Sequence, residues 1–323
     1  MTRSINNAVR KAAAVMMAAA MVIGVSACGS SASEETTAAA ETEAAGTEAA
    51  EAETETAETE ASGETEAEAE TEAAGGTLRV AMECAYAPYN WTQSDDSNGA
   101  VQISGSSDYA YGYDVMMAKK IAEELGMELE IVRSDWDSLI PALQSDKVDC
   151  VIAGQSITSE RLQTVDFTEP YYYASVVALT KSDSEYADAA GVADLAGGTC
   201  TSQQNTIWYD SCLPQIADAN ILAAQESAPA MLVALESDRV DYIVTDMPTA
   251  KAACIAYPDL KILDFTGSDD DFEVSEEDIN IGISIKKGNT ELKDKINEVL
   301  ATMTTDDYNA MMDEAISVQP LAQ

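Results

Sequence analysis

The sequence predicts an α/β fold of two similar lobes, each a mostly parallel sheet flanked by helices. Strand-like and helix-like segments alternate along 77–323, which favours parallel strands joined by crossover helices. The segment 141–154 returns at 233–246 with six identical residues and a constant offset of 92. The 247 residues from position 77 onward have the length of one large domain or two small lobes.

The first half of this region contains five expected elements. A strand is predicted at 78–83, and helical spacing covers 114–125, with Asp114 as a candidate N-cap and Gly126 as the C-terminal stop. The remaining elements are a strand at 128–132, a helix at 137–144 and a short buried strand at 150–153.

The second half repeats this plan. The expected strands are 199–202, 221–224, 242–245, 261–263 and 281–285, and the expected helices are 228–237, 247–257 and 291–303. The echo between 141–154 and 233–246 is compatible with a convergent helix–turn–strand joint, although two similar lobes are the preferred interpretation. In that case the strand ends at 153–154 and 245–246 occupy matching places and face a cleft, because ligands bind beyond the carboxyl ends of strands in such sheets.

The first 28 residues have the features of an export signal. A basic start precedes an apolar run of 14 residues at 12–25, too short to cross a bilayer, which needs about 20, but typical of a secretory signal. The run closes on VSACG at 25–29, which resembles the bacterial lipobox and implies lipid modification of Cys28. An ordinary signal peptide cleaved after an alanine is the alternative.

Residues 29–76 are predicted to form a disordered acidic tether. They consist only of Ala, Glu, Thr, Gly and Ser, and the stretch 34–72 contains 15 Glu and no Lys or Arg. Such a segment buries too little apolar surface to offset the entropy of ordering it, and its like charges repel. A spacer between a membrane anchor and a folded domain is the expected role.

Charge and composition exclude several classes of function. The chain has 58 acidic and 17 basic residues, and the part from position 77 onward carries about −29. This argues against a nucleic-acid partner, since phosphate binding needs clustered cations. The chain contains no histidine, which excludes His-dependent triads and most zinc sites. Neither a metal nor a cofactor is expected.

Five cysteines follow Cys28, and because their number is odd at least one is unpaired. None has metal-ligand spacing, so small buried apolar residues are the preferred interpretation, with a bridge within the second lobe as the alternative. They are Cys84, Cys150, Cys200, Cys212 and Cys254.

Polar residues at the two strand ends fit the two charges of a free amino acid. A carboxylate is best held by an arginine with added hydroxyl or backbone donors, and Ser156 and Arg161 follow the first strand end. An ammonium needs a carboxylate acceptor, and Asp246 stands at the second. Taken singly, Arg161 is compatible with a solvated surface residue and Asp246 with a helix cap.

An ordered set of segments resembles the amino-acid-binding proteins of ABC importers, extracellular solute-binding family 3. The set includes LRVAMECAYAPYNW, GYDVMMAKKIAEELG, AGQSITSER, DRVDYIVTDMPTA and NIGISIKKGN, and the resemblance covers 77–317. It implies a two-lobed periplasmic-binding-protein-like (type II) fold with a hinge. The implied division is a first lobe at 77–175, a second lobe at 176–268 and a return to the first lobe at 269–323.

The resemblance also implies roles for particular residues in binding the ligand head group. Arg161, Ser156 and Thr206 would hold the ligand carboxylate, with Thr206 opening a helix whose free N–H groups favour an anion. Asp246 and the backbone carbonyl near Gly154 would accept from the ammonium.

Four further residues are implied around the rest of the ligand. Tyr86 and Trp136 would form aromatic walls along its stem. Glu83 would read the ligand side chain, which favours a cationic or amide-bearing amino acid, and Gln203 would lie at the rim of the second lobe.

The sequence departs from the family pattern in two places. The segment 92–110 is longer than in compact members and is expected to be a surface loop, with a cover over the cleft as the alternative. Gln204 and Asn205 stand before Thr206 where the family pattern has Ser-Gly, so the resemblance does not imply the geometry of this turn. The tyrosines at 171–173 are expected to pack at the hinge.

The implied function is the substrate-binding component of an ABC importer, without catalytic activity. It would capture a free, polar or cationic α-amino acid by hinge closure, as a lipid-anchored monomer outside the cell, and deliver it to a membrane permease. The alternatives are an enzyme on the same fold, similar to the cyclohexadienyl or prephenate dehydratases with Glu83 as the candidate acid or base, and a sensory lipoprotein that presents ligand to a receptor.

Overall fold

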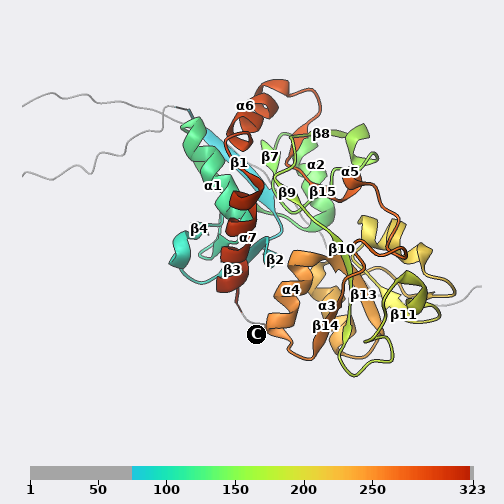
Figure 1. Ribbon diagram of the computed structural model, residues 1–323. Helices are drawn as coiled ribbons and strands as arrows, with labels where there is room; N and C mark the ends of the chain where they lie inside the picture. Colours follow the sequence, from blue (N-terminus) through green and yellow to red (C-terminus); the bar gives the residue numbers. More distant parts are fainter. Residues whose placement is uncertain (1–74, 321–323) are drawn as a thin grey trace, which may run out of the picture. The chain divides into compact units, whose positions relative to one another are not determined.

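Two five-stranded sheets organise the part of the chain that the structure, a computed structural model, describes: residues 75–320, without the side chains at 276 and 277 (Figure 1). These residues fall within one compact unit of the chain. The expected leader with Cys28, and all but the last two residues of the expected tether, lie outside the described residues.

The first lobe contains the sheet with the strand order β6-β1-β7-β16-β8. Strand β1 pairs in parallel with β6 and β7, whereas β16 is antiparallel to both of its neighbours, so four strands run one way and one runs against them. The strands are β1 (Thr77–Met82), β6 (Glu128–Arg133), β7 (Cys150–Val151), β8 (Val165–Phe167) and β16 (Ser284–Lys286), and the helices are α1 (Tyr113–Leu125), α2 (Leu139–Gln144), α6 (Thr290–Leu300) and α7 (Thr305–Val318).

The second lobe has the same plan, with the strand order β12-β11-β13-β10-β14. Again two parallel pairings are followed by one strand, β10, that is antiparallel to both neighbours. The strands are β10 (Val176–Lys181), β11 (Thr199–Thr201), β12 (Asn220–Ile221), β13 (Tyr242–Asp246) and β14 (Leu260–Leu263), and the helices are α3 (Ala228–Glu236) and α4 (Met247–Ala256). The matching order and directions confirm two similar lobes with mostly parallel sheets. Strand β10 is an element that the sequence reasoning missed.

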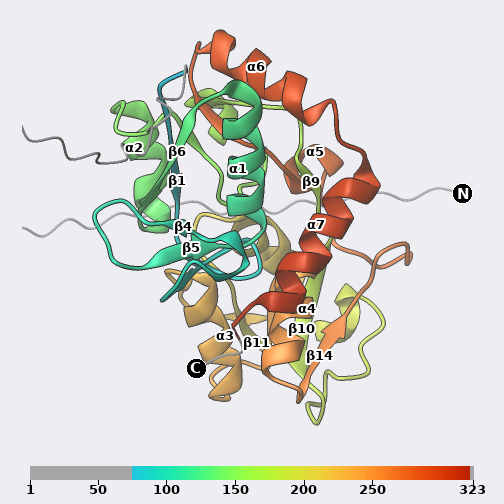
Figure 2. The same cartoon turned by 90° about the vertical axis from the view of Figure 1, so that its left-hand side faces the viewer.

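Two segments cross between the lobes and pair with each other. Strand β9 (Tyr172–Tyr173) is antiparallel to β15 (Asn280–Ile281), which follows the short helix α5 (Glu276–Ile279). The strand expected at 281–285 is therefore two strands, β15 in the crossing and β16 in the first sheet. Helix α7 contacts α1 of the first lobe and α4 of the second (Figure 2). The expectation that the tyrosines at 171–173 pack at the interlobe crossing is confirmed.

Helix α1 begins one residue earlier than expected, and its N-cap is Gly112. The interpretation of Asp114 as the cap is wrong, because its side chain is fully buried and accepts hydrogen bonds from Asn90 and Tyr171 instead. The predicted stop is confirmed, since Gly126 has the left-handed conformation with φ 64°, which glycine adopts without steric cost.

The segment 92–110 contains short strands among mostly exposed turns, so the expectation of a surface loop is confirmed only in part. It completes a four-stranded antiparallel sheet and meets β6 through a bridge between Ile103 and Ile131. The strands are β2 (Ala85–Tyr86), β3 (Asn90–Gln93), β4 (Val101–Gln102) and β5 (Tyr109–Tyr111), with a short turn of helix at Ser97–Gly99. No residue of 94–110 lines any of the cavities described below.

The five cysteines in the described part of the chain are all free, which agrees with the preferred interpretation. Four are buried and one, Cys254, is half-buried. Burial raises the pKa of the buried thiols Cys84 and Cys212 to about 12, so neither is a reactive thiolate at neutral pH.

The repeated helix–turn–strand joint has the same bonds in both lobes. The hydroxyl of Ser145 donates to the carbonyl of Pro141 over 2.8 Å, and that of Ser237 donates to Val233 over 2.6 Å. Next along the chain, Asp146 pairs with Lys286 on β16, and Asp238 pairs with Lys181 on β10.

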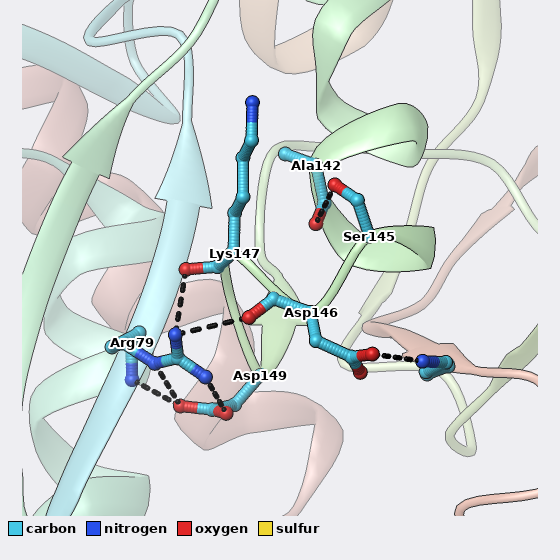
Figure 3. Close-up of polar contacts among 7 residues, drawn as sticks. Arg79, Ala142, Ser145, Asp146, Lys147 and Asp149 are labelled. Atoms are coloured by element: carbon cyan, nitrogen blue, oxygen red, sulfur yellow. Dashed lines mark hydrogen bonds and ion pairs between the residues drawn. The ribbon is translucent and has the colours of Figure 1, made fainter.

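The two joints differ in how they contact the neighbouring strand of the sheet. Asp149 accepts from the backbone N–H of Arg79 over 2.9 Å, and Asp241 accepts from that of Thr199 over 2.7 Å. Only in the first lobe does a guanidinium add a two-pronged contact, from Arg79 to both oxygens of Asp149 (Figure 3).

Candidate functional site

The ends of β7 and β13 meet at one small cavity between the two lobes. Gly154 and Ser156, which follow β7, line it together with Asp246, the last residue of β13. Ile207 and Trp208 also line it, and sequence reasoning singled out neither, although a tryptophan two residues after Thr206 was a usable signal. The structure therefore brings three predicted site residues together, while their roles toward a ligand stay a prediction.

Arg161 extends from the first lobe toward the second. Its Nη1 donates to the carbonyl of Ser156 over 2.9 Å, and its Nη2 donates to the carbonyl of Asn205 over 2.8 Å. The guanidinium carbon lies 5.3 Å from the ring centre of Trp136, within the range of a cation–π contact.

No carboxylate in the described part of the chain forms an ion pair with Arg161. The acids Glu160 and Asp210 line the same cavity and act on Arg161 through their charge, without a paired contact. Burial lowers the pKa of Arg161 to about 10, so the group stays charged at neutral pH. A charged, partly buried guanidinium bonded only to neutral carbonyls is suited to receive an anion.

Asp246 is the opposite charge, and only 2% of its surface is exposed. Its Oδ1 accepts from the backbone N–H of Thr249 over 2.8 Å, which makes it the N-cap of α4. Its Oδ2 accepts from the hydroxyl of Tyr86 over 2.7 Å. Burial raises the pKa of Asp246. The cap is confirmed, and because a carboxylate accepts several hydrogen bonds, the cap leaves acceptor capacity for an ammonium.

Tyr86 and Trp136, the predicted aromatic walls, are both buried residues of the first lobe that contact the second. The hydroxyl of Tyr86 bonds to Asp246, and the indole N–H of Trp136 donates to the carbonyl of Gln204 over 3.1 Å. The Tyr86 ring also packs on Gly154, where a Cβ would lie 2.8 Å from it and where φ is 62°. Only glycine fits that position.

Thr206 opens the helical turn that leads into the helix Trp208–Cys212, as expected, because its hydroxyl accepts from the backbone N–H of Tyr209 over 3.4 Å. The Thr206 hydroxyl donates to the carbonyl of Gln203 over 2.7 Å. Thr206 and Arg161 line one cavity of about 610 Å³.

Glu83 follows β1, and its side chain is 7% exposed. Its Oε2 is buried without a hydrogen-bond partner among the described residues. Burial, followed by the charges of Asp114, Asp135 and Asp137, raises the pKa of Glu83 to about 7.

A second cavity, of about 490 Å³, opens beside Glu83 and Trp136. Residues from both lobes line it, and its acidic members are Glu83, Asp135, Asp137 and Glu226. A buried acceptor without a partner in such a cavity favours a donor or a cation. Gln203, which is 1% exposed, has the complementary feature, because its Nε2 donor has no partner among the described residues.

A buried network behind the site centres on Asp114, whose role sequence reasoning missed. Asp114 accepts from the side-chain amide of Asn90 over 2.7 Å and from the hydroxyl of Tyr171 over 2.6 Å. Asn90 in turn accepts from the backbone of Cys84, and Tyr171 accepts from that of Gly154. The network joins two segments that carry site residues, and its only signal in the sequence was an acid within the first turn of a helix.

Arg161 lines the cavity of about 610 Å³ and Asp246 lines the smaller one, so the two opposite charges belong to separate cavities. Within residues 75–320 there is no cluster of three or more acids or cysteines with the geometry of a metal site. A search of the same residues finds no helix that combines the length and apolarity needed to cross a bilayer.

The chain is similar to known proteins in sequence and in fold. The sequence model of one family, the bacterial extracellular solute-binding proteins, family 3, matches residues 78–316 of this chain. A probable histidine-binding protein of Campylobacter jejuni is 31% identical over 184 residues, which are 57% of this chain and 65% of that protein, slightly less than two thirds of its length. The ABC transporter arginine-binding protein 1 of Escherichia coli K12 is 27% identical over 202 residues, 62% of this chain and 79% of that protein.

Among solved structures, an ancestral arginine-binding protein is 31% identical to this chain. Its arginine complex covers 74% of this chain and 97% of its own, with a TM-score of 0.59. The same protein was also solved with glutamine bound, and that structure superposes with the same TM-score.

Proposed function

Since the chain belongs to the bacterial extracellular solute-binding proteins, family 3, we propose that it captures a free α-amino acid for an ABC importer. The amino acid binds between the two lobes, which close around it about the paired crossing strands, and a membrane permease then receives it. The protein acts as a monomer and as a binding protein, not as an enzyme.

The proposal rests on one observation above the others: two opposite charges without ionic partners among the described residues lie in opposite lobes, Asp246 at the end of β13 and Arg161 in the segment that follows β7. Arg161 in the first lobe bonds only to neutral carbonyls, and Asp246 in the second accepts only from an amide and a hydroxyl. A ligand carboxylate suits the first group and a ligand ammonium suits the second. Ser156, Thr206 and Gly154 lie beside them and complete the proposed head-group contacts.

The side chain of the proposed ligand is cationic or carries an amide. Glu83 offers it a buried acceptor, with Trp136 as an apolar wall and Gln203 as a buried donor. An acidic side chain would meet Glu83 and the acids around it in a poorly solvated space, which is unfavourable. The names of the relatives, which refer to histidine and arginine, support this choice.

The test is a thermal-shift panel of the free amino acids with the purified protein. A ligand present at 100 times its dissociation constant adds about 2.7 kcal/mol to the free energy of unfolding. We expect L-arginine, L-lysine, L-histidine or L-glutamine to raise the melting temperature, and L-aspartate and L-glutamate not to. A panel in which no amino acid raises it rejects the proposal.

We further propose that a lipid on Cys28 retains the protein at the outer face of the cytoplasmic membrane, where a permease is within reach. The support is the short apolar run followed by small residues and a cysteine. Cys28→Ser in the full chain is expected to move the protein from the membrane fraction to the medium or periplasm. Membrane retention of the Cys28→Ser chain would contradict the anchor.

A further inference from the structure

Gln204 and Asn205, the two residues before Thr206, form polar contacts with the first lobe through both backbone and side chains. Their backbone carbonyls accept from Trp136 and Arg161. Their side-chain amides make a separate contact with Asp137, a residue that the proposed amino-acid site does not use.

Both oxygens of Asp137 are engaged across the lobes. Oδ2 accepts from the side-chain amide of Gln204 over 2.6 Å, and Oδ1 accepts from that of Asn205 over 2.7 Å. Each bond joins a neutral donor to a charged acceptor, and such bonds are shorter and stronger than those between neutral groups. Together they fix the carboxylate in two directions.

Local backbone geometry positions the two amides. Asn205 has φ 56°, a left-handed conformation that asparagine tolerates better than other residues with a Cβ. Asp137 lies in the short helical turn Trp136–Ser138, next to the tryptophan that bonds to the same segment. Both partners are therefore held by rigid neighbours on their own lobes.

The contact lies at the edge of the proposed site. Asp137 and Gln204 line the cavity beside Glu83, while Asn205 lines the cavity beside Arg161. Because these side chains come from opposite lobes, their bonds exist only while the lobes are together.

We propose that Asp137, Gln204 and Asn205 form an interlobe clasp that holds the lobes together over the bound amino acid and slows its release. This rests on the proposed function. Asp137 is a positioning residue that does not touch the ligand. A contact made only in the closed arrangement raises the population of that arrangement, and its loss acts on the dissociation rate more than on the association rate.

The first test measures L-arginine kinetics by stopped-flow tryptophan fluorescence on the full chain. Asp137→Ala is expected to raise the dissociation rate about tenfold and to leave the association rate within about twofold. Gln204→Ala combined with Asn205→Gly, which keeps the left-handed turn, is expected to do the same. All three substitutions together are expected to add little, because the bonds are then already lost.

Glu128→Ala is the control, because it removes an exposed acid of the first lobe that lines neither cavity and does not touch the clasp. Its dissociation rate is expected to stay within about twofold of the parent rate. An equal rise in Glu128→Ala and Asp137→Ala would mean that the net charge matters and not the clasp, and an unchanged rate in Asp137→Ala would also overturn the proposal.

The second test follows lobe closure directly. The chain has three tryptophans, and incorporation of 5-fluorotryptophan gives each a ¹⁹F signal. Saturating L-arginine is expected to move the Trp136 signal of the parent chain toward that of a buried tryptophan, and to move the Trp136 signal of Asp137→Ala by a smaller amount. An equal ligand-induced shift in both chains would overturn the clasp. If no amino acid shifts the signal of the parent chain, the proposed function fails instead.

Discussion

Each lobe has two neighbouring parallel strands whose ends lie beside the interlobe cavities. They are β1 and β7 in the first lobe and β11 and β13 in the second. Their registers match, since Val80 pairs with Cys150 as Cys200 pairs with Tyr242. Counting on from these pairs, Glu83 matches Gln203 and Gly154 matches Asp246.

The matched positions carry different chemistry on the same frame. At the first matched position, Glu83 supplies a buried acceptor in one lobe and Gln203 a buried donor in the other. Both atoms lack partners among the described residues. At the second, glycine gives room to Tyr86 whereas aspartate supplies a charge. The joints beneath these ends share their bonds. Under the proposed function, the shared joints supply stability and the differing residues at the strand ends supply recognition.

The largest expected effect comes from comparing two arginines, one proposed to serve recognition and one that stabilises a joint. Arg161→Ala is expected to weaken amino-acid binding about 100-fold or more, because truncation leaves a desolvated carboxylate without its partner. Its melting temperature is expected to change little, since Arg161 has no acidic partner in the described part of the chain. Isothermal titration calorimetry and thermal unfolding measure the two effects.

Arg79→Ala is the matched control, taken from the joint in the first lobe. It removes the two-pronged contact to Asp149, and because that contact is partly exposed, we expect a loss of about 1 kcal/mol of stability. Affinity is expected to stay within about twofold. Weak binding in Arg79→Ala, or normal binding in Arg161→Ala, would contradict the division.

The next largest expected effect is the pH dependence of L-arginine affinity, which tests the difference between Glu83, which titrates, and Gln203, which does not. Burial raises the pKa of Glu83 to about 7, so the side chain is mostly neutral at pH 5.5 and mostly charged at pH 8.5. A guanidinium favours the charged form. The affinity for L-arginine is therefore expected to rise about tenfold across this range, and Glu83→Gln is expected to abolish most of the rise.

The stability of the protein alone changes in the opposite direction. Glu83 has a higher pKa in the folded chain than in the unfolded chain, so its contribution is fully present below about pH 4.5 and is lost as the pH rises through about 7. Burial raises the pKa of Asp114 to about 7 as well, which adds to the same trend. A Glu83→Gln protein that keeps the full pH dependence of L-arginine binding would rule out this role for Glu83.

The smallest expected effect lies in the joints themselves. Asp146→Asn and Asp238→Asn each remove one exposed ion pair while keeping a residue that tolerates φ near 60°. Exposed pairs contribute little, so each melting temperature is expected to fall by about 2 °C or less, by similar amounts and without effect on affinity. A large fall in only one of them would show that the two joints are not equivalent.

The repeated elements could be read from the sequence because their signals are local. Helix α1 ends at a glycine and both joints repeat Ser-Asp followed by a buried strand. The failures had two physical causes. Strand β10 is a continuous apolar run without alternation, which periodicity does not distinguish from a helix segment. The strands within 92–110 are two to four residues long and form through pairing between distant positions.

The candidate site was partly predictable for a related reason. Asp246 could be proposed because it stands at the end of one predicted strand, and Arg161 because it lies in the segment after another, on the side of the sheets where ligands bind. The bonds from Tyr86 to Asp246 and from Asp137 to Gln204 join residues far apart in the chain, and they depend on how one lobe faces the other. No local pattern encodes that relation.

The most direct test of the central claim, that Arg161 and Asp246 hold the two charges of an amino acid, compares L-arginine with analogues that lack one charge. Agmatine lacks the carboxylate, and 5-guanidinopentanoate lacks the α-ammonium. Calorimetry on the full chain is expected to give measurable binding of L-arginine and a loss of about 100-fold or more for each analogue. Binding of either analogue within about tenfold of L-arginine would contradict the claim.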